Sequence, residues 1–298
     1  MTGRIAIALL AALVVTAPAA AARSRPVSRV VVVVMENKDF DQLYGSPEAP
    51  YLNRLANRYV RMERFFGVSH PSLPNYLALL GGSTFGVQHN CTDCGFDKRN
   101  LVDQLNAAGV SWRAYMQGMP RPCFDGPSSG AYAKRHNPFM YFESIVRNRA
   151  RCRNVVPGSR LRADERKGRL PRFVWVTPDT CFDSHNCSIA VGDRYLSRLL
   201  PPLLRRLGPR GFLVLTYDEG LGDAGCCGGI AHGGQIPTVI AGPDVRRGRR
   251  IATEYSLYSI LRTIEDAFAL RPLKTAAAVE PLEEAFRRPP RLRRRGDH

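Results

Sequence analysis

Four runs of consecutive apolar, mostly β-branched residues stand out along the chain, and none of them alternates with polar residues. They cover residues 29–35, 172–177, 212–217 and 237–241, with the sequences RVVVVVM, RFVWVT, FLVLTY and PTVIA. Such runs are typical of strands buried on both faces, usually parallel strands in a sheet that helices cover. Segments with helical spacing lie between them, at 50–58, 73–80, 100–108, 189–207 and 255–270. This alternation predicts an α/β sandwich with a mostly parallel central sheet.

Residues 84–170 have a different composition, rich in Gly, Pro, Cys and Arg and poor in clear strands. We interpret this segment as a loop-rich insertion or long connection near the active face, partly stapled by disulfides. We expect the helix over 255–270 to be the last regular element and order to fade after about residue 285.

The N-terminus has the pattern of a secretory signal peptide. Arg4 is followed by a run of thirteen mostly apolar residues and then by small residues, so that cleavage after Ala22 is plausible. The apolar run is shorter than the ~20 residues of a spanning helix, although an uncleaved N-terminal anchor is the alternative. We predict a signal peptide over 1–22, a secreted or extracytoplasmic protein without a transmembrane segment after signal removal, and a catalytic domain over 27–272.

Export also accounts for the eight cysteines, because an even number in an oxidising compartment suggests disulfides. We favour a loop staple for Cys91 and Cys94, although this CxxC could be half of a zinc site or a redox motif. Cys181 and Cys187 bracket a short loop and could close it.

The remaining cysteines leave the connectivity open. Cys226 and Cys227 are adjacent in the chain, so a bond between them would be strained. Each of them could equally bond elsewhere, so the sequence does not define the connectivity.

The net charge of +17 is partly concentrated at the C-terminus, where FRRPPRLRRRGDH has six arginines among thirteen residues. We predict a basic, disordered tail over 273–298, because this composition is too polar and too Pro-rich to pack. Such a tail could attract an anionic surface such as phospholipid, or it could serve only solubility. No aromatic interleaving or motif indicates specific nucleic-acid binding.

Acidic and imidazole side chains gather next to the predicted strands, and in open α/β sheets ligands bind at the carboxyl ends of strands. Clustered carboxylates repel one another unless a cation lies between them. Oxygen ligands suit Mg²⁺, Ca²⁺ or Mn²⁺, and imidazole shifts the preference toward Zn²⁺ or Fe. The alternative is that each acidic residue only caps the next helix. The residues concerned are Glu36, Asn37, Asp183, His185, Asp218, Glu219 and His232.

A candidate nucleophile, Ser72, lies in the segment SHPSLPNY. Two prolines flank it and a helical pattern follows, which places Ser72 at or near a helix N-terminus, where free N–H groups stabilise an anion. A serine there could attack phosphorus while Asn75 donates to the phosphoryl oxygens. On spacing alone, the pattern favours a helix cap for Ser72, with Pro74 in the first turn, over a nucleophile.

At these residues the chain resembles the bacterial phosphoesterase family, which contains acid phosphatases and phosphatidylcholine-type phospholipases C, within the alkaline phosphatase superfamily. The resemblance covers about residues 30–270. Four blocks in order support it and a fifth, YSLYSILRTIEDAFAL, is weaker. The four blocks are VVVVMENKDFDQLYG, SHPSLPNYLALLGGS, DSHNCSIAVGDRYLSRLLPPLL and LTYDEG followed by HGGQIPTVIAGP.

The resemblance implies an alkaline-phosphatase-like fold and one firm site for a divalent metal ion. It implies that Ser72 becomes phosphorylated and that Asn75 contacts the phosphate. The residues that resemble the ligands of the firm metal site are Glu36, Asn37, Asp218 and Glu219.

Asp183, His185 and His232 match positions that build a second metal site elsewhere in the superfamily, or that contact the phosphate in one-metal members. His185 or His232 could also protonate the leaving group. His136, in KRHNPFMYF, resembles a family segment that reaches the pocket.

Two departures from the family pattern bear on the second metal. Many relatives read NDMHD where this chain has FDSHN at 182–186, and many have a His in the block where this chain has Leu257. One metal is therefore favoured over two.

The function predicted from these residues is metal-dependent hydrolysis of a phosphate monoester through a phosphoserine at Ser72. The substrate would be a small phosphate ester or a phospholipid. One alternative is a phospholipase C or phosphodiesterase, although that branch usually carries extra domains. The other is a secreted protein that binds phosphate esters without turning them over.

Overall fold

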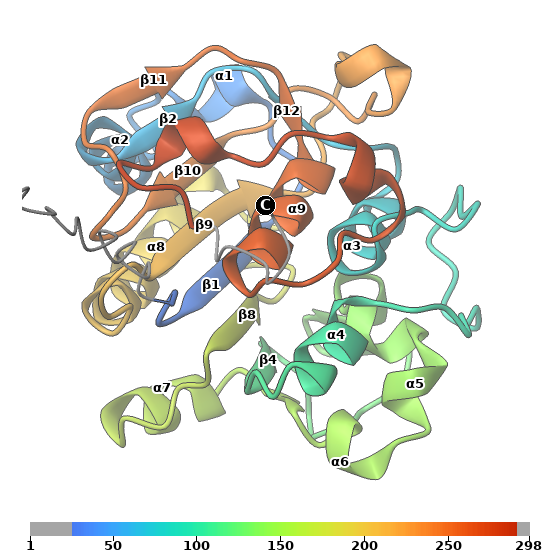
Figure 1. The fold of residues 1–298 in the computed structure, drawn as a ribbon. Coiled ribbons are helices and arrows are strands. Elements are labelled where there is room, and N and C mark those ends of the chain that lie inside the picture. The colour runs from blue at the N-terminus through green and yellow to red at the C-terminus, as the bar shows by residue number, and fades with distance from the viewer. Residues whose placement is uncertain (1–25, 291–298) are drawn as a thin grey trace, which may run out of the picture.

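The computed structural model describes residues 26–290, and an eight-stranded sheet forms its centre (Figure 1). The predicted signal peptide and the last eight residues lie outside the described range. In spatial order the strands are β11 (Arg249–Ile251), β2 (Val60–Met62), β10 (Thr238–Ala241), β9 (Phe212–Tyr217), β1 (Val30–Met35), β8 (Phe173–Thr177), β4 (Trp112–Met116) and β7 (Val155–Pro157).

Strand β1 occupies the middle of this sheet and pairs in parallel with β8 and with β9. Val30 lies opposite Phe173 on one side and opposite Phe212 on the other. Every residue of β1 is fully buried, as its continuous apolar run predicts. Strand β10 alone runs against its neighbours, antiparallel to both β9 and β2. The prediction of a mostly parallel sheet is therefore confirmed.

Helices cover the sheet on its two sides, because α3 packs against α9 and α2 packs against α8 (Figure 1). All five predicted helices are present, with ends that differ by up to three residues from the expected ranges. The helices are α1 (Phe40–Leu43), α2 (Pro50–Arg58), α3 (Ser72–Gly81), α4 (Leu101–Ala107), α5 (Glu143–Val146), α6 (Arg149–Cys152), α7 (Arg160–Arg166), α8 (Ile189–Arg205) and α9 (Leu257–Ala267).

Short strands and 3-10 turns complete the described chain. Strand β12 pairs with β3 in parallel, and β5 pairs with β6 in an antiparallel hairpin. These elements are β3 (Phe65–Phe66), β5 (Ser128–Ser129), β6 (Tyr132–Ala133), β12 (Tyr255–Ser256), η1 (Lys134–His136), η2 (Pro138–Tyr141), η3 (Cys227–Gly229), η4 (Lys274–Ala278) and η5 (Glu283–Ala285).

The segment 84–170 is rich in loops and stapled by disulfides, as expected, but it also contributes to the central sheet. Strands β4 and β7 come from this segment and extend the sheet beyond β8. No sequence pattern indicates β7, because its three residues are too few to show a period. The segment is therefore partly a continuation of the core and not only an insertion.

All eight cysteines form disulfides. The loop staple and the short closed loop predicted from spacing are both present. The adjacent cysteines, for which alternatives were open, bond to each other. The pairs are Cys91–Cys94, Cys123–Cys152, Cys181–Cys187 and Cys226–Cys227.

The boundary predicted after residue 272 lies too early in the chain. Leu282 and Phe286 are buried, and Phe286 forms an isolated bridge with Val245. Arg288 then pairs with Asp244 at 2.7 Å. The prediction weighed the arginines and prolines of this segment and gave too little weight to its apolar residues, which pack on the domain. Residues 291–298 lie outside the described range.

Within residues 26–290, no helix combines the length and the apolar character that crossing a bilayer requires.

A buried carboxyl on α9 makes the stability of the fold depend on pH. Glu265 is fully buried, its Oε1 accepts a hydrogen bond from the N–H of Leu273 at 2.9 Å, and burial raises its pKa to about 8 from 4.5. In the unfolded chain this carboxyl ionises at its ordinary pKa. The folded state therefore loses stability as the pH rises from about 4.5 to about 8.

We expect Glu265→Gln to flatten this pH dependence, because the amide keeps an acceptor and never ionises. Each unit of pKa difference is worth about 1.4 kcal/mol. The wild-type protein should therefore lose a few kcal/mol of unfolding free energy across this pH window, and the variant should not show this loss. Urea unfolding at several pH values measures it. Glu48→Gln, at an exposed carboxyl, is the control, and an unchanged slope in Glu265→Gln would contradict the assignment.

Candidate active site

The site begins at the carboxyl end of β1, where Glu36 and Asn37 follow the last strand residue. Glu36 is fully buried. Asn37 adopts a left-handed backbone conformation with φ 41°, which Asn tolerates better than most residues. This turn lets the Asn37 N–H donate to Asp218 Oδ1 at 3.0 Å and its Nδ2 donate to Glu219 Oε1 at 3.0 Å. The ends of β1 and β9 are thereby joined, as parallel neighbouring strands predict.

Ser72 is the first residue of α3 and its side chain is buried. Its hydroxyl lies 3.0 Å from Glu219 Oε1 and 3.1 Å from Glu36 Oε2. Three separate segments, the ends of β1 and β9 and the start of α3, therefore meet at one hydroxyl group. This position at the helix N-terminus agrees with the prediction from the two flanking prolines. A role as a simple N-cap does not fit, because the observed cap residue is Pro71.

The loop that precedes Ser72 is held by Asn75. Its Oδ1 accepts hydrogen bonds from the N–H groups of Val68 and Ser69 at 2.7 and 3.0 Å. Its Nδ2 donates to the carbonyls of Ser69 and Pro71 at 2.6 and 3.3 Å. The side chain of Asn75 thus orders the loop that presents Ser72. Contact with phosphate stays a prediction.

Two glycines allow a second loop to pass close to the Ser72 loop. A Cβ atom on Gly67 would lie 2.5 Å from the carbonyl oxygen of Gly233, and one on Gly233 would lie 2.6 Å from the carbonyl oxygen of Ser69. Only glycine fits such an approach of two backbones. The first glycine of the HGGQ segment is therefore needed for packing beside the nucleophile loop.

The next amide of α3 has a side-chain partner. The N–H of Leu73 donates to Asn90 Oδ1 at 3.0 Å. Free N–H groups in the first turn of a helix are the groups that bind phosphoryl oxygens. The side-chain oxygen of Asn90 therefore occupies the Leu73 N–H, a hydrogen-bond donor that an anion bound at Ser72 could otherwise use.

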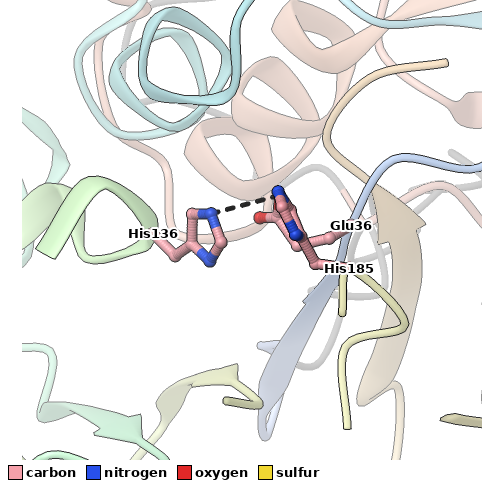
Figure 2. A group of neighbouring side chains, drawn as sticks. All are labelled: Glu36, His136 and His185. Atoms are coloured by element: carbon pink, nitrogen blue, oxygen red, sulfur yellow. Dashed lines mark ion pairs between the residues drawn. The ribbon is translucent and has the colours of Figure 1, made fainter. Parts of the chain in front are cut away.

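His136 lies between the two carboxylates Glu36 and Asp183. Its Nε2 is 3.3 Å from Glu36 Oε2 and its Nδ1 is 3.4 Å from Asp183 Oδ2. The imidazole stacks on Tyr76 with ring centroids 5.6 Å apart, and the ring centroid of His185 lies 5.8 Å from that of His136. Figure 2 shows that the side chain of His136 points toward Glu36 and that His185 lies beside Glu36.

Burial and mutual repulsion shift the pKa values of these groups strongly. Burial and the charges of Asp218 and Asp183 raise the pKa of Glu36 well above its usual range. Burial raises the pKa of Asp183 to about 8, and burial with the charge of Glu219 raises that of Asp218 to about 7. Burial lowers the pKa of His136, which keeps the imidazole neutral. The carboxyls cannot all ionise cheaply unless a cation balances them.

The donor set fits a divalent metal ion. Within residues 26–290, the buried atoms Asn37 Oδ1 and Asp218 Oδ2 have no hydrogen-bond partner. Such orphaned oxygens are rare in folded proteins unless they serve a ligand. A second group, Glu36, His136 and His185, offers one carboxylate oxygen and two imidazole nitrogens within 4.8 Å of one another. Neutral imidazole is the form that binds metal.

In the described chain, His136 lies with His185 beside the buried Glu36, whereas His232 does not join this group. The N–H of His232 donates to the carbonyl of Val68 at 3.1 Å, but its side chain is exposed. In the described part of the chain, no hydrogen bond or ion pair joins its imidazole to the carboxylates. The roles predicted for His232 stay predictions. His185 does reach the site, and its N–H donates to Asp183 Oδ1 at 2.8 Å.

Two side chains that were not predicted to belong to the site also contact it. Tyr76 OH donates to Glu36 Oε1, and His70 Nδ1 contacts Glu219 Oε2. Tyr76 lies one helical turn after Ser72 on α3, so the i, i+4 spacing was a signal for it. His70 lies two residues before Ser72, where proximity to the nucleophile was the only hint.

Comparison with known proteins agrees with this geometry. The sequence model of the Phosphoesterase family matches residues 44–271. This chain belongs to the phosphoesterase family. It is 33% identical over 261 residues to "Phosphatidylinositol-3-phosphatase" of Mycobacterium tuberculosis, a match that covers 87% of this chain and 83% of that protein. The phosphoesterase is accordingly a hydrolase of phosphoric esters.

More distant relatives include "Probable acid phosphatase" of Kluyveromyces lactis, 28% identical over 80% of this chain and 57% of that protein. The phosphoesterase thus spans a little over half the length of this fungal relative. A solved structure from Vibrio parahaemolyticus, described as a protein in the alkaline phosphatase superfamily, shares the fold. Its TM-score is 0.56 at 13% identity, over 88% of this chain and 72% of that one.

The loop role of Asn75 can be tested by mutation. We expect Asn75→Ala to lower the free energy of unfolding by about 2–4 kcal/mol, because each lost hydrogen bond is worth about 1 kcal/mol and buried amides are left unpaired. Thermal and urea unfolding measure this change. Asn53→Ala, at a side chain that also donates to backbone carbonyls but lies away from Ser72, is a matched control for activity.

Turnover separates the two variants. Asn75→Ala should also lose activity because the Ser72 loop is no longer fixed, whereas Asn53→Ala should keep it. Full stability in Asn75→Ala would contradict the structural role.

Proposed function

We propose that this chain is a secreted, metal-dependent phosphomonoesterase that acts through a phosphoserine at Ser72. The observation that carries the proposal is the position of the Ser72 hydroxyl, within 3.1 Å of both Glu36 and Glu219 at the start of α3. A buried serine that two carboxylates hold at a helix N-terminus has an acceptor for its proton and donors for an incoming anion.

The reaction proceeds in two displacements. Ser72 Oγ attacks the phosphorus atom while its proton passes toward Glu219 Oε1 or Glu36 Oε2, and the bond from phosphorus to the alcohol oxygen breaks. The alcohol oxygen takes up a proton as it leaves. Water then attacks the phosphoserine, inorganic phosphate departs, and the Ser72 hydroxyl regains a proton.

The oxygens of Glu36, Asn37, Asp218 and Glu219 would hold the firm metal ion, and His136 with His185 would contribute to a second one. A divalent ion there polarises phosphoryl oxygens and lowers the pKa of a nearby hydroxyl. Two orphaned buried oxygens, on Asn37 and Asp218, support the first site. The cluster of Glu36, His136 and His185 supports the second.

Histidine side chains would manage the leaving group. His185 is exposed beside the buried His136, so its imidazole can meet an alcohol oxygen at the mouth of the site. His136, which burial keeps neutral, would orient Glu36 and Asp183. Where no second ion is bound, we favour His185 over His232 as the proton donor, because of these two histidines only His185 contacts the buried cluster.

Relatives that are named phosphatases favour a monoester substrate over the diester of a phospholipase C. The name of the mycobacterial relative suggests a phosphorylated inositol lipid as one candidate substrate. Four disulfides within residues 26–290 support an oxidising, extracytoplasmic location. Together with the signal-like residues 1–22, they make secretion the favoured destination.

We expect Ser72→Ala to lower turnover of an aryl phosphate monoester at least about 1000-fold, because the nucleophile is lost. Metal content, measured by elemental analysis, should stay the same. Ser197→Ala, at a half-buried serine on α8 that donates to the carbonyl of Arg194, is the control and should keep full activity. Turnover near that of the wild type in Ser72→Ala would refute the nucleophile assignment.

Chelation tests the metal. Dialysis of the purified protein against a chelator should abolish turnover and lower Tm, because the carboxylates of Glu36 and Asp218 then repel without a counter-ion. Adding back Mg²⁺, Ca²⁺, Mn²⁺, Zn²⁺ or Fe²⁺ one at a time should identify the ion that restores both. A chelator saturated with metal beforehand is the control. Full activity in a sample shown to be metal-free would contradict the metal-dependent mechanism.

A further inference from the structure

A second charged cavity lies at the outer edge of the sheet, beside β7. Its volume is about 530 Å³ and its wall is dominated by arginines. No acidic side chain lines it. The arginines are Arg113, Arg121, Arg149, Arg153 and Arg160.

Most of this positive charge is not neutralised by the protein. Arg113 pairs with Asp164 at 2.6 Å, but its Nε is buried without a hydrogen-bond partner among residues 26–290. Arg121 lies over the ring of Phe124 at 5.5 Å, which fixes the guanidinium group without offsetting its charge. In the described range, no carboxylate forms an ion pair with the four arginines other than Arg113. Such like charges repel one another unless an anion lies between them.

Covalent and backbone links hold together the backbone segments that carry the arginines. The disulfide Cys123–Cys152 joins the loop of Arg121 to α6, whose ends carry Arg149 and Arg153. The N–H of Cys123 also donates to the carbonyl of Val155 on β7 at 3.0 Å. Because the loop, the helix and the edge strand are tied together, the cavity is preformed, and less entropy is lost on binding than at a mobile surface.

The cavity is separate from the phosphoesterase site. In the order of the sheet, β8 and β4 lie between β1, which carries Glu36, and β7. Figure 1 shows α6 and α7, which flank the cavity, at the lower end of the view and away from α9. A ligand bound among the arginines would therefore not be the ester that Ser72 attacks.

We propose that this arginine cavity binds a compact anion that carries two or more phosphate groups, either as a free molecule or as a lipid headgroup. The guanidinium group matches phosphate with two parallel hydrogen bonds, and several guanidinium groups around one hollow suit several phosphates. The concave shape favours a compact polyanion over a flat charged surface. Bound at this edge, the ligand would hold the enzyme near a phosphate-rich source while the Ser72 site stays open.

Calorimetry with inositol hexakisphosphate tests the proposal. The titration uses the full chain with Ser72→Ala, and phosphate release is followed in the same sample so that residual hydrolysis is seen. We expect binding that weakens as salt is added. Adding Arg149→Glu and Arg153→Glu should remove one binding site per chain or weaken it roughly tenfold or more, because two charge-assisted contacts are lost.

Two comparisons make this result specific. Arg166→Glu with Lys167→Glu changes the same charge at exposed residues outside the cavity and should leave binding intact. With Ser72 present, the protein with Arg149→Glu and Arg153→Glu should keep wild-type turnover of an aryl phosphate. Loss of ligand binding in the cavity can thus be distinguished from loss of the Ser72 reaction. Unchanged binding in the cavity variant, or an equal loss in the control pair, overturns the proposal.

Vesicles distinguish the two sources of the ligand. Phosphatidylcholine vesicles with and without phosphatidylinositol bisphosphate are sedimented with the Ser72→Ala protein. Retention that needs both the bisphosphate lipid and the arginine cavity supports a headgroup ligand. Binding of the free hexakisphosphate without such retention supports a soluble one. Retention that survives Arg149→Glu with Arg153→Glu overturns the cavity as the docking site.

Discussion

The burial of several carboxyl groups around one hydroxyl is the constraint on which the site depends. Glu36 and Asp218 are fully buried within reach of each other, and Asp183 lies behind them. In a low-dielectric interior such charges are costly, so they persist only where the surrounding structure holds them firmly. The sheet supplies that firmness, because β1 and β9 end side by side and Asn37 ties the two ends together. A phosphoester site follows from this arrangement of strand ends.

Sequence pattern predicted the interior of this fold much better than its edges. The four apolar runs are strands at or near the centre of the sheet, where burial on both faces forces continuous apolar residues. Strands β2, β7 and β11 have three residues each, and strands this short carry no readable period. The packed end of the chain was missed for a related reason, since Leu282 and Phe286 lie among charged residues and prolines.

The site residues that follow predicted strands could be predicted from the sequence. Those that reach the site from distant segments of the chain could not. Glu36 and Asp218 follow buried strands, so their meeting could be argued from the sequence alone. His136 comes from the loop-rich segment, and only family resemblance pointed to it. His70 needed the fold itself, because nothing local links it to Glu219. His232 lies near a strand end in the sequence but its side chain is exposed, because proximity to a strand end does not fix where a side chain points.

The reversed direction of β10 shapes how this enzyme could diversify. Because β10 is antiparallel to β9, the connection over 218–237 begins at the carboxyl end of β9 and returns to the sheet at the same end of the strands, beside the loop that precedes Ser72. That connection carries the exposed Leu221 and Ile230 and the Cys226–Cys227 bond. A loop anchored at both ends on one edge can lengthen or change composition without disturbing strand order. Evolution could therefore exchange the residues of this connection while the strands and the carboxylates at their ends stay constant.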